Sequence, residues 1–348
     1  MKIEICTNPS YTVTVENGVI NRTGKIISEI LKKDSKILIV SDSNVFPLYG
    51  STIEKNLQDA GFRVCKFIFE AGETSKKLNT VSRIYEKMAE AGFTRTDAIV
   101  TLGGGVAGDM GGFAAATFLR GISFVQIPTS LLAQVDASVG GKTGVDIVYG
   151  KNLVGAFHQP RAVIIDPDTL KTLPQSHIND GLGEIIKYGC ISDKELFDNM
   201  EKEDFSARFR ELISVCVKSK KEFVEEDARD TGRRMLLNFG HTFGHALEKL
   251  NNFQRLLHGE AVGIGMLIAA GIGEQMGITE AGTEKKIEAL LKKYGLPTEP
   301  GFSSDDILAE TALDKKGDGD SLNLILLKAI GEAKIVKVPR KEIRRYMR

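Results

Sequence analysis

Three of the chain's five histidines fall in one short stretch of the sequence, at His241, His245 and His258. Residues four apart lie on one face of a helix, so the side chains of His241 and His245 would project side by side. Neutral imidazole is the commonest protein ligand of divalent metals, and catalytic zinc takes three protein ligands and leaves one position open. A lone histidine more often caps a helix or fills a half-buried position. Three together favour a metal site, which a carboxylate would complete.

A glycine-rich segment, Gly103–Asp109, offers a second kind of chemistry. It follows an apolar run at residues 98–102 and opens a helix, where exposed N–H groups and the helix dipole favour phosphate. Its glycines match G-x-G-x-x-G, but no acidic residue stands about 20 positions later, as the dinucleotide fingerprint requires. Asp42, which ends the first long apolar run, is the better candidate for a ribose contact. Each glycine alone could serve a tight turn or close packing; the whole loop predicts a pyrophosphate site.

Two lysines lie among further glycines, Lys142 in Gly140–Gly144 and Lys151 in Gly150–Gly155. A backbone with little side-chain bulk lets these lysines approach an anionic ligand closely. A solvated surface position is the alternative for either lysine taken alone.

Short apolar runs alternate with amphipathic segments in the first half of the chain, which predicts a parallel sheet with helices on both faces. We expect strands at residues 36–42, 62–69, 98–102 and 122–127, and helices from about residue 45, over 76–91 and after the glycine loop. Helical periodicity dominates from residue 183 to 294, and residues 322–338 suggest a small hairpin. The sequence therefore predicts an α/β Rossmann-like domain over residues 1–174 and a mainly α-helical domain over residues 175–348, packed around a shared cleft.

The composition excludes several classes of partner. Lys and Arg together number 46, as do Asp and Glu, so no global field attracts nucleic acid or an anionic membrane. The N-terminus has no signal-peptide core, and the longest apolar run, Ala261–Gly273, is too short and too rich in glycine to span a bilayer. Four scattered cysteines without a Cys-x-x-Cys pair indicate free thiols in a reducing compartment, and hence a cytoplasmic protein.

Taken together, the motifs resemble those of the 3-dehydroquinate synthase family, in that family's order. The matching segments run from the first third of the chain nearly to its end: Gly103–Asp109, Arg120–Gly121, Pro128–Gly144, Gly150–Pro160, Glu184–Lys187, Leu237–Glu248, His258–Val262 and Asp314–Lys316. The resemblance implies a Rossmann-like N-terminal domain, an α-helical C-terminal domain and an active site between them. It also implies NAD, a divalent metal (zinc or cobalt) and a homodimer.

The resemblance assigns roles by position. It implies that Glu184, His241 and His258 bind the metal, and that His245 transfers protons instead, with Lys142, Asn152 and Lys187 as the other catalytic residues. The NAD contacts would be Asp42, Asn44, Val45, Gly72, Glu73, Thr74, Ser75, Lys76, Gly105, Val106, Ala107, Gly108, Asp109, Thr129, Ser130, Lys142, Lys151, Thr169, Leu170, Lys171 and Thr172. The substrate contacts would be Asp136, Lys220, Arg234, Asn238, a lysine of the Lys315–Lys316 pair, with Lys316 preferred, and Arg120, contributed across the dimer interface.

The implied activity is that of a carbon–oxygen lyase acting on a phosphate. The substrate, 3-deoxy-D-arabino-heptulosonate 7-phosphate, is converted to 3-dehydroquinate and phosphate in the second step of the shikimate pathway, towards chorismate and the aromatic amino acids. The implied course is transient oxidation by NAD, phosphate elimination, re-reduction, ring opening and intramolecular aldol closure. The alternatives are another sugar-phosphate cyclase, a metal-dependent polyol dehydrogenase, and a non-catalytic module that senses NAD or metal.

The chain departs from the family pattern in two places. Asp227-Ala228-Arg229-Asp230 stands where the family commonly has Asp-Glu-x-Glu, so Asp230 would keep the second acidic role with a shorter side chain. Ala71 precedes Gly72 where an aspartate is usual, and we expect little effect of this change on NAD binding.

Overall fold

The computed structural model describes residues 1–203, 208–251, 255–311 and 321–347. Their contacts form two compact units, Met1–Leu173 with Phe209–Arg229, and Pro174–Arg208 with Asp230–Arg348. The chain therefore passes between the units at three points. The sequence placed residues 209–229 in the second domain, whereas in the structure they group with the first unit.

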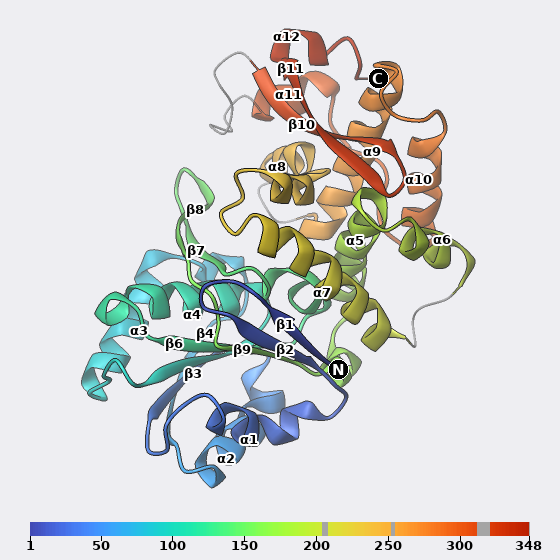
Figure 1. Cartoon of the computed structure of the whole chain (residues 1–348). Helices are drawn as coiled ribbons and strands as arrows, with labels where there is room; N and C mark the ends of the chain where they lie inside the picture. Colours follow the sequence, from blue (N-terminus) through green and yellow to red (C-terminus); the bar gives the residue numbers. More distant parts are fainter. Residues whose placement is uncertain (204–207, 252–254, 312–320, 348) are drawn as a thin grey trace. The chain divides into compact units, whose positions relative to one another are not determined.

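A seven-stranded sheet forms the centre of the first unit, in the order β1-β2-β9-β6-β5-β3-β4 (Figure 1). All neighbouring pairs are parallel except β1 and β2, which pair antiparallel at one edge. The strands are β1 (Lys2–Ile5), β2 (Tyr11–Val15), β3 (Lys36–Asp42), β4 (Arg63–Phe69), β5 (Ala98–Gly103), β6 (Ser123–Pro128) and β9 (Ala162–Ile165). The four expected strands thus appear as β3, β4, β5 and β6.

Helices cover both faces of this sheet, so the side chains of its central strands are buried except at some strand ends. Within β3, Ile37 and Ile39 pack in one core with η1, α1 and α2, whereas Leu38 and Val40 pack in another with α3 and α4. This is the alternation that successive strand residues impose. The helical elements of this region are η1 (Val19–Arg22), α1 (Thr23–Ser28), η2 (Phe46–Gly50), α2 (Ser51–Asp59), η3 (Glu73–Ser75), α3 (Leu78–Glu90), α4 (Gly105–Thr117) and η4 (Phe118–Arg120).

The first unit also contains a two-stranded hairpin and a long helix that lie outside the seven-stranded sheet. Strands β7 (Lys142–Ile147) and β8 (Gly150–Phe157) form a separate antiparallel hairpin that projects from it (Figure 1). Helix α7 (Phe209–Glu226) packs on η5 (Ala133–Ala137) and on β1 and β2, and the main-chain N–H of Cys6 donates to Glu225 Oε1 at 2.5 Å. The remaining element is η6 (Pro167–Thr172).

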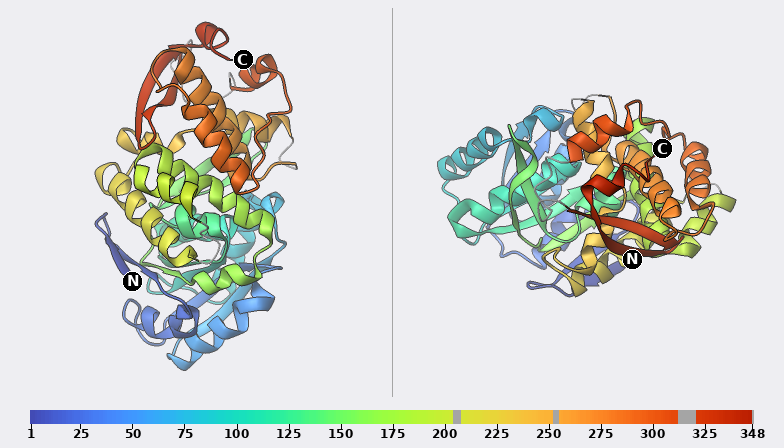
Figure 2. Two further views of the ribbon diagram at one scale, coloured as in Figure 1. Left: turned by 90° about the vertical axis from the view of Figure 1, so that its right-hand side faces the viewer. Right: turned by 90° about the horizontal axis from the view of Figure 1, so that it is seen from above.

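The second unit is built mainly of helices. Helix α9 is buried along most of its length and contacts α5, α8 and α10, and Figure 2 shows it from two further directions. Small residues permit this packing: a Cβ on Gly259 would lie 1.9 Å from the main-chain oxygen of Asp180 on α5. The elements are α5 (Gln175–Ile191), α6 (Lys194–Lys202), η7 (Arg233–Asn238), α8 (His241–Leu250), α9 (His258–Gln275), α10 (Thr283–Lys293), α11 (Ser304–Thr311), β10 (Ser321–Ala329), β11 (Glu332–Pro339) and α12 (Arg340–Ile343).

These elements confirm the predicted fold class, an α/β Rossmann-like part with a parallel sheet followed by a mainly helical part. The expected C-terminal hairpin is β10–β11. Among the helices of the described residues, none has the length and apolar character needed to cross a membrane.

Candidate metal centre and cofactor site

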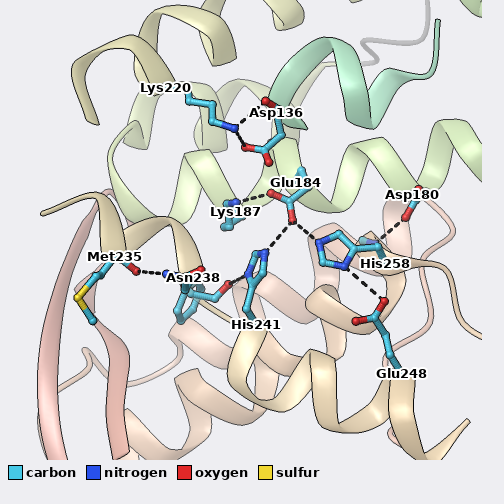
Figure 3. A network of polar contacts seen from close by, with 12 residues as sticks. Asp136, Asp180, Glu184, Lys187, Lys220, Met235, Asn238, His241, Glu248 and His258 are labelled. Atoms are coloured by element: carbon cyan, nitrogen blue, oxygen red, sulfur yellow. Dashed lines mark hydrogen bonds and ion pairs between the residues drawn. The ribbon is translucent and has the colours of Figure 1, made fainter. Parts of the chain in front are cut away.

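Three helices bring Glu184, His241 and His258 together in the second unit (Figure 3). Glu184 lies in the middle of α5, whereas the two histidines are the first residues of α8 and α9. The Nε2 atoms of His241 and His258 each lie 3.6 Å from Glu184 Oε1. Residues far apart in the sequence thus present one oxygen and two nitrogens to a common point.

This cluster fits a divalent cation. Glu184 has no exposed surface, and its Oε1 atom accepts no hydrogen bond from the described residues. Ligands held about 2.1 Å from a tetrahedral metal are separated by about 3.4 Å, close to the observed oxygen–nitrogen distances. A buried carboxylate oxygen that faces two imidazole nitrogens without a hydrogen bond is what a cation would satisfy.

The electrostatics of the two histidines differ. Burial lowers the pKa of His241 well below its usual range, and the neighbouring Lys187 ammonium lowers it further, so this imidazole is neutral at physiological pH. Burial also acts to lower the pKa of His258, but the hydrogen bond and charge of Glu248, aided by Glu184, outweigh it and raise that pKa to about 9. In the metal-free protein His258 therefore carries a proton that a metal would have to displace.

The other predicted residues of the second unit lie on α5, α8 and η7. Lys187, one turn after Glu184, forms a buried ion pair with Glu184 Oε2. His245 is exposed, with its ring centroid 5.4 Å from that of His241 and 5.9 Å from that of His258. Asn238, which donates from Nδ2 to Met235 O at 3.1 Å, and Arg234, only 1% exposed, both belong to η7.

In the first unit, Asp42 and the glycine loop meet where the strand order reverses. After β3 the chain adds β4 on one side and then β5 on the other, and the carboxyl end at such a switch point is where nucleotides bind in open α/β sheets. A Cβ on Gly103 would lie 3.1 Å from Asp42 Oδ2. Asp42 Oδ1 accepts the main-chain N–H groups of Asn44 and Val45, both at 2.9 Å. Gly105–Asp109 form the first turns of α4, with their N–H groups at its N-terminus.

Two further segments of the predicted cofactor set lie near these strand ends. The N–H of Thr129 donates to Gly103 O at 2.9 Å, and the Ser130 hydroxyl would lie 3.3 Å from a Cβ on Gly104. In η6 the polar side chains are engaged with protein groups: Thr169 accepts from Gln134 Nε2 at 2.9 Å, Thr172 Oγ1 lies 2.5 Å from the Tyr49 hydroxyl, and Lys171 pairs with Asp168 at 2.7 Å. Leu170 is buried.

Lys76 connects the 72–76 segment to two other predicted site residues. Its Nζ lies 2.7 Å from Asp109 Oδ2 and donates to Asn152 Oδ1 at 2.6 Å, and the lysine is 5% exposed. Gly72 has φ of +115°, which suits glycine at the start of this turn. Around it, Glu73 Oε1 lies 3.8 Å from Lys76 Nζ, Ser75 Oγ donates to Glu70 O at 2.5 Å and Thr74 is exposed.

The family model for the 3-dehydroquinate synthase N-terminal domain matches residues 66–180, and that for the C-terminal domain matches residues 181–317. The 3-dehydroquinate synthase of Clostridium acetobutylicum is 48% identical, covering 100% of this chain and 99% of the relative. The chain belongs to the 3-dehydroquinate synthase family.

Solved structures agree with this membership. A 2-deoxy-scyllo-inosose synthase complexed with carbaglucose-6-phosphate, NAD+ and Co2+ is 26% identical with a TM-score of 0.89, covering 99% of both chains. ValA, a 2-epi-5-epi-valiolone synthase from Streptomyces hygroscopicus with NAD+ and Zn2+ bound, is 29% identical with a TM-score of 0.86, covering 97% of this chain and 95% of that one. A probable glycerol dehydrogenase from Sinorhizobium meliloti, 16% identical with a TM-score of 0.64, shares the fold; it covers 96% of this chain and 94% of that one.

The remaining residues that the 3-dehydroquinate synthase resemblance assigned are placed as follows. Lys220 on α7 is 5% exposed, with its Nζ 2.9 Å from Asp136 Oδ1 (Figure 3). Arg120 is exposed and has φ of +66°, an uncommon backbone for arginine. Lys142 and Lys151 lie on the β7–β8 hairpin. Lys315 and Lys316 lie outside the described residues.

The sequence analysis did not identify two carboxylates that lie beside the metal cluster. Glu248 Oε1 lies 3.5 Å from His258 Nδ1, and Asp180 Oδ1 accepts the N–H of Gly259 at 2.6 Å. Spacing held a signal for both. Glu248 follows His241 by seven residues, which is two helical turns, and Asp180 precedes Glu184 by four residues, which is one turn. Each carboxylate therefore lies on the same helix face as a proposed ligand.

Proposed function

We propose that this chain converts 3-deoxy-D-arabino-heptulosonate 7-phosphate to 3-dehydroquinate and phosphate. One observation carries the proposal: the buried Glu184 oxygen faces two imidazole nitrogens in a chain 48% identical, over its full length, to a 3-dehydroquinate synthase. The cationic side chains Lys142, Lys187, Lys220 and Arg234, together with Asn152 and Asn238, suit a substrate that carries a carboxylate and a phosphate.

Glu184, His241 and His258 would hold the divalent cation, zinc or cobalt. Two similar enzymes, 2-deoxy-scyllo-inosose synthase and ValA, bind Co2+ and Zn2+ respectively, each together with NAD+. NAD would occupy the carboxyl edge of the first unit's sheet, with Asp42 at the ribose and the first turn of α4 at the pyrophosphate. Transient oxidation and re-reduction of the substrate is the chemistry that bound NAD supplies, and positive charge beside a substrate oxygen is what the cation supplies.

The chain's own residues would bind, orient and move protons. The exposed imidazole of His245, which stands beside the His241 ring, is our candidate for proton transfer. Asn152 is held by Lys76 and by Asp146, which accepts the Asn152 N–H at 2.7 Å, so its amide is oriented before substrate arrives. The Lys187 ammonium, held by Glu184, would keep a fixed positive charge for the anionic substrate.

We further propose a cytoplasmic homodimer in which Arg120 reaches the partner's substrate. The free cysteines among the described residues suit a reducing compartment. The exposed Arg120, in an uncommon backbone conformation, suits a contact outside its own chain. Mixing inactive Arg120→Ala and His245→Ala variants would restore activity if the arginine acts across the interface, and would leave the mixture inactive if it acts within one chain.

The test is a turnover count. Metal-loaded protein is given the heptulosonate phosphate and less NAD than enzyme, while phosphate release and NADH absorbance are followed together. Many phosphates per NAD without accumulated NADH support the redox-neutral reaction. NADH that accumulates with product indicates a net dehydrogenase instead. Turnover of a different sugar phosphate alone would replace the substrate and leave the cofactors in place.

A further inference from the structure

Each nitrogen of the His258 ring lies opposite a carboxylate oxygen. Nε2 faces Glu184 Oε1 at 3.6 Å, and Nδ1 faces Glu248 Oε1 at 3.5 Å (Figure 3). The three residues come from three helices, α9, α5 and α8. A carboxylate on the far side of a metal-binding imidazole selects the ring tautomer and its orientation.

Glu248 is placed deep enough for this role. It is 2% exposed and lies on the face of α8 that also carries His241, seven residues earlier. An ionised carboxylate this far from water is costly unless a partner compensates it, and the partner at Oε1 is the His258 ring.

Asp180 fixes the main chain under the same ring. Its Oδ1 accepts the Gly259 N–H at 2.6 Å, and the residue is 6% exposed. Gly259 leaves no room for a side chain against α5, so the first turn of α9 rests directly on the helix that carries Glu184. Contacts with α5 therefore fix the position of the His258 main chain, and the contact with Glu248 on α8 fixes the orientation of its ring.

We propose that Glu248 and Asp180 are positioning residues for the cation site, with Glu248 holding the Nδ1–H of His258 so that the Nε2 lone pair is directed at the metal. This inference rests on the metal site of the proposed function. It assigns no ligand role to Glu248, although His245, Glu248 and His258 also bring ligand atoms within 4.8 Å of one another.

The test measures Zn2+ affinity of metal-free protein by competition with a chromophoric chelator, together with the number of ions bound. Glu248→Ala and Asp180→Ala should each weaken binding about 10- to 100-fold while one ion still binds. Glu248→Gln keeps an oxygen that can accept the Nδ1–H and should lose less. The visible spectrum of the Co2+-loaded protein should shift in the Glu248 variants, because the His258 ring then turns relative to the ion.

Glu260→Ala is the matched control for the alanine variants. Glu260 lies in the same first turn of α9 and accepts the N–H of Leu257 at 2.9 Å, so its loss weakens the helix start without releasing the ring. We expect wild-type affinity for this variant. Equal losses in Glu260→Ala and Glu248→Ala would reduce Glu248 to a general stabiliser and overturn the inference. Thermal unfolding of each metal-free variant verifies that it is folded.

Glu184→Gln distinguishes a failure of the proposed metal site from a failure of the positioning role of Glu248 and Asp180. If it loses zinc binding while Glu248→Ala and Asp180→Ala bind as tightly as wild type, the metal site stands and the positioning inference fails. If Glu184→Gln binds zinc as wild type does, the proposed metal site itself fails. Two ions per wild-type chain, with one lost in Glu248→Ala, would make Glu248 a ligand and overturn its positioning role.

Discussion

Glu184 and Lys187, one turn apart on α5, form an ion pair in which the side chains are 0% and 1% exposed. The pair uses only one oxygen of the carboxylate, Oε2, and leaves Oε1 facing the two histidines. One buried carboxylate thus serves two positive neighbours, a permanent ammonium on one side and the proposed cation on the other.

Removing the ammonium should therefore change stability and metal affinity in opposite directions. In Lys187→Met the metal-free protein loses the partner of a buried charge, which should cost about 3–5 kcal/mol in the free energy of unfolding. Zinc should bind this variant more tightly than wild type, because Glu184 is no longer shared. Urea unfolding with and without zinc measures both effects. An unchanged urea midpoint in the metal-free variant would contradict the burial argument, and Lys187→Met/Glu184→Gln should recover part of the lost stability.

Metal binding should release one proton below pH 9. His258 has a pKa of about 9 in the metal-free protein and must lose its proton to ligate, whereas the lowered pKa of His241 leaves that ring already neutral. Apparent zinc affinity should rise about tenfold per pH unit from pH 7 to 9 and then level off. Titration calorimetry in two buffers of different ionisation enthalpy counts the proton. The same affinity from pH 7 to 9 would show that His258 is not protonated there.

The same shift predicts a stability change in the metal-free protein. A folded-state pKa of about 9 lies above the unfolded value of about 6.5, so the His258 contribution is complete below pH 6.5 and is lost as the pH rises to 9. The difference in unfolding free energy between wild type and Glu248→Gln should shrink over that window. A constant difference would exclude Glu248 as the source of the raised pKa.

Lys76 should contribute both to NAD binding and to turnover of the substrate. Lys76→Met removes the partner of Asp109 at 2.7 Å and of Asn152 at 2.6 Å, so we expect weaker NAD binding and a fall in kcat/KM of about 100-fold. Lys77→Met is the matched control, because Lys77 is exposed and should behave as wild type. Steady-state kinetics with NAD or sugar phosphate varied separate the two effects. Equal behaviour of both variants would remove Lys76 from the site.

Alanine substitutions at two glycines of α4 should have different effects, because the added methyl group would meet different neighbours. A Cβ on Gly105 would lie 3.7 Å from the Ala137 side chain, an ordinary contact, so Gly105→Ala should stay stable but weaken NAD binding by blocking the approach of phosphate. A Cβ on Gly111 would lie 2.3 Å from Thr101 Cγ2, so Gly111→Ala should cost about 1–3 kcal/mol in stability. Calorimetric NAD titration and urea unfolding test both variants. Undiminished NAD affinity in Gly105→Ala would argue against a phosphate at this turn.

Much of the fold could be predicted from local patterns of apolar residues in the sequence. The apolar run Lys36–Asp42 is β3 from end to end, because a strand buried on both faces reads as a continuous apolar segment. The grouping of residues 209–229 with the first unit could not be read in this way. Amphipathic periodicity in α7 shows that one face is buried, but it does not say against which elements.

The site shows the same limit. Spacing alone pairs His241 with His245, since they are four residues apart, whereas in the structure His241 and His258 face Glu184 and His245 stays exposed. Only the family resemblance pointed to Glu184. Helical spacing places Glu248 on the face of His241 and Asp180 on the face of Glu184, but it does not show their role, which depends on how α5, α8 and α9 meet.

The threefold passage of the chain between the units constrains how such a protein can be divided. A fragment that stops at residue 174 would lack α7, and with it the lysine that pairs with Asp136 and the carboxylate that accepts the Cys6 N–H. It would expose the surfaces of η5, β1 and β2 that α7 covers. A single break in the chain therefore does not separate the two units. A chimera between members of the family must take residues 209–229 from the same parent as the N-terminal half.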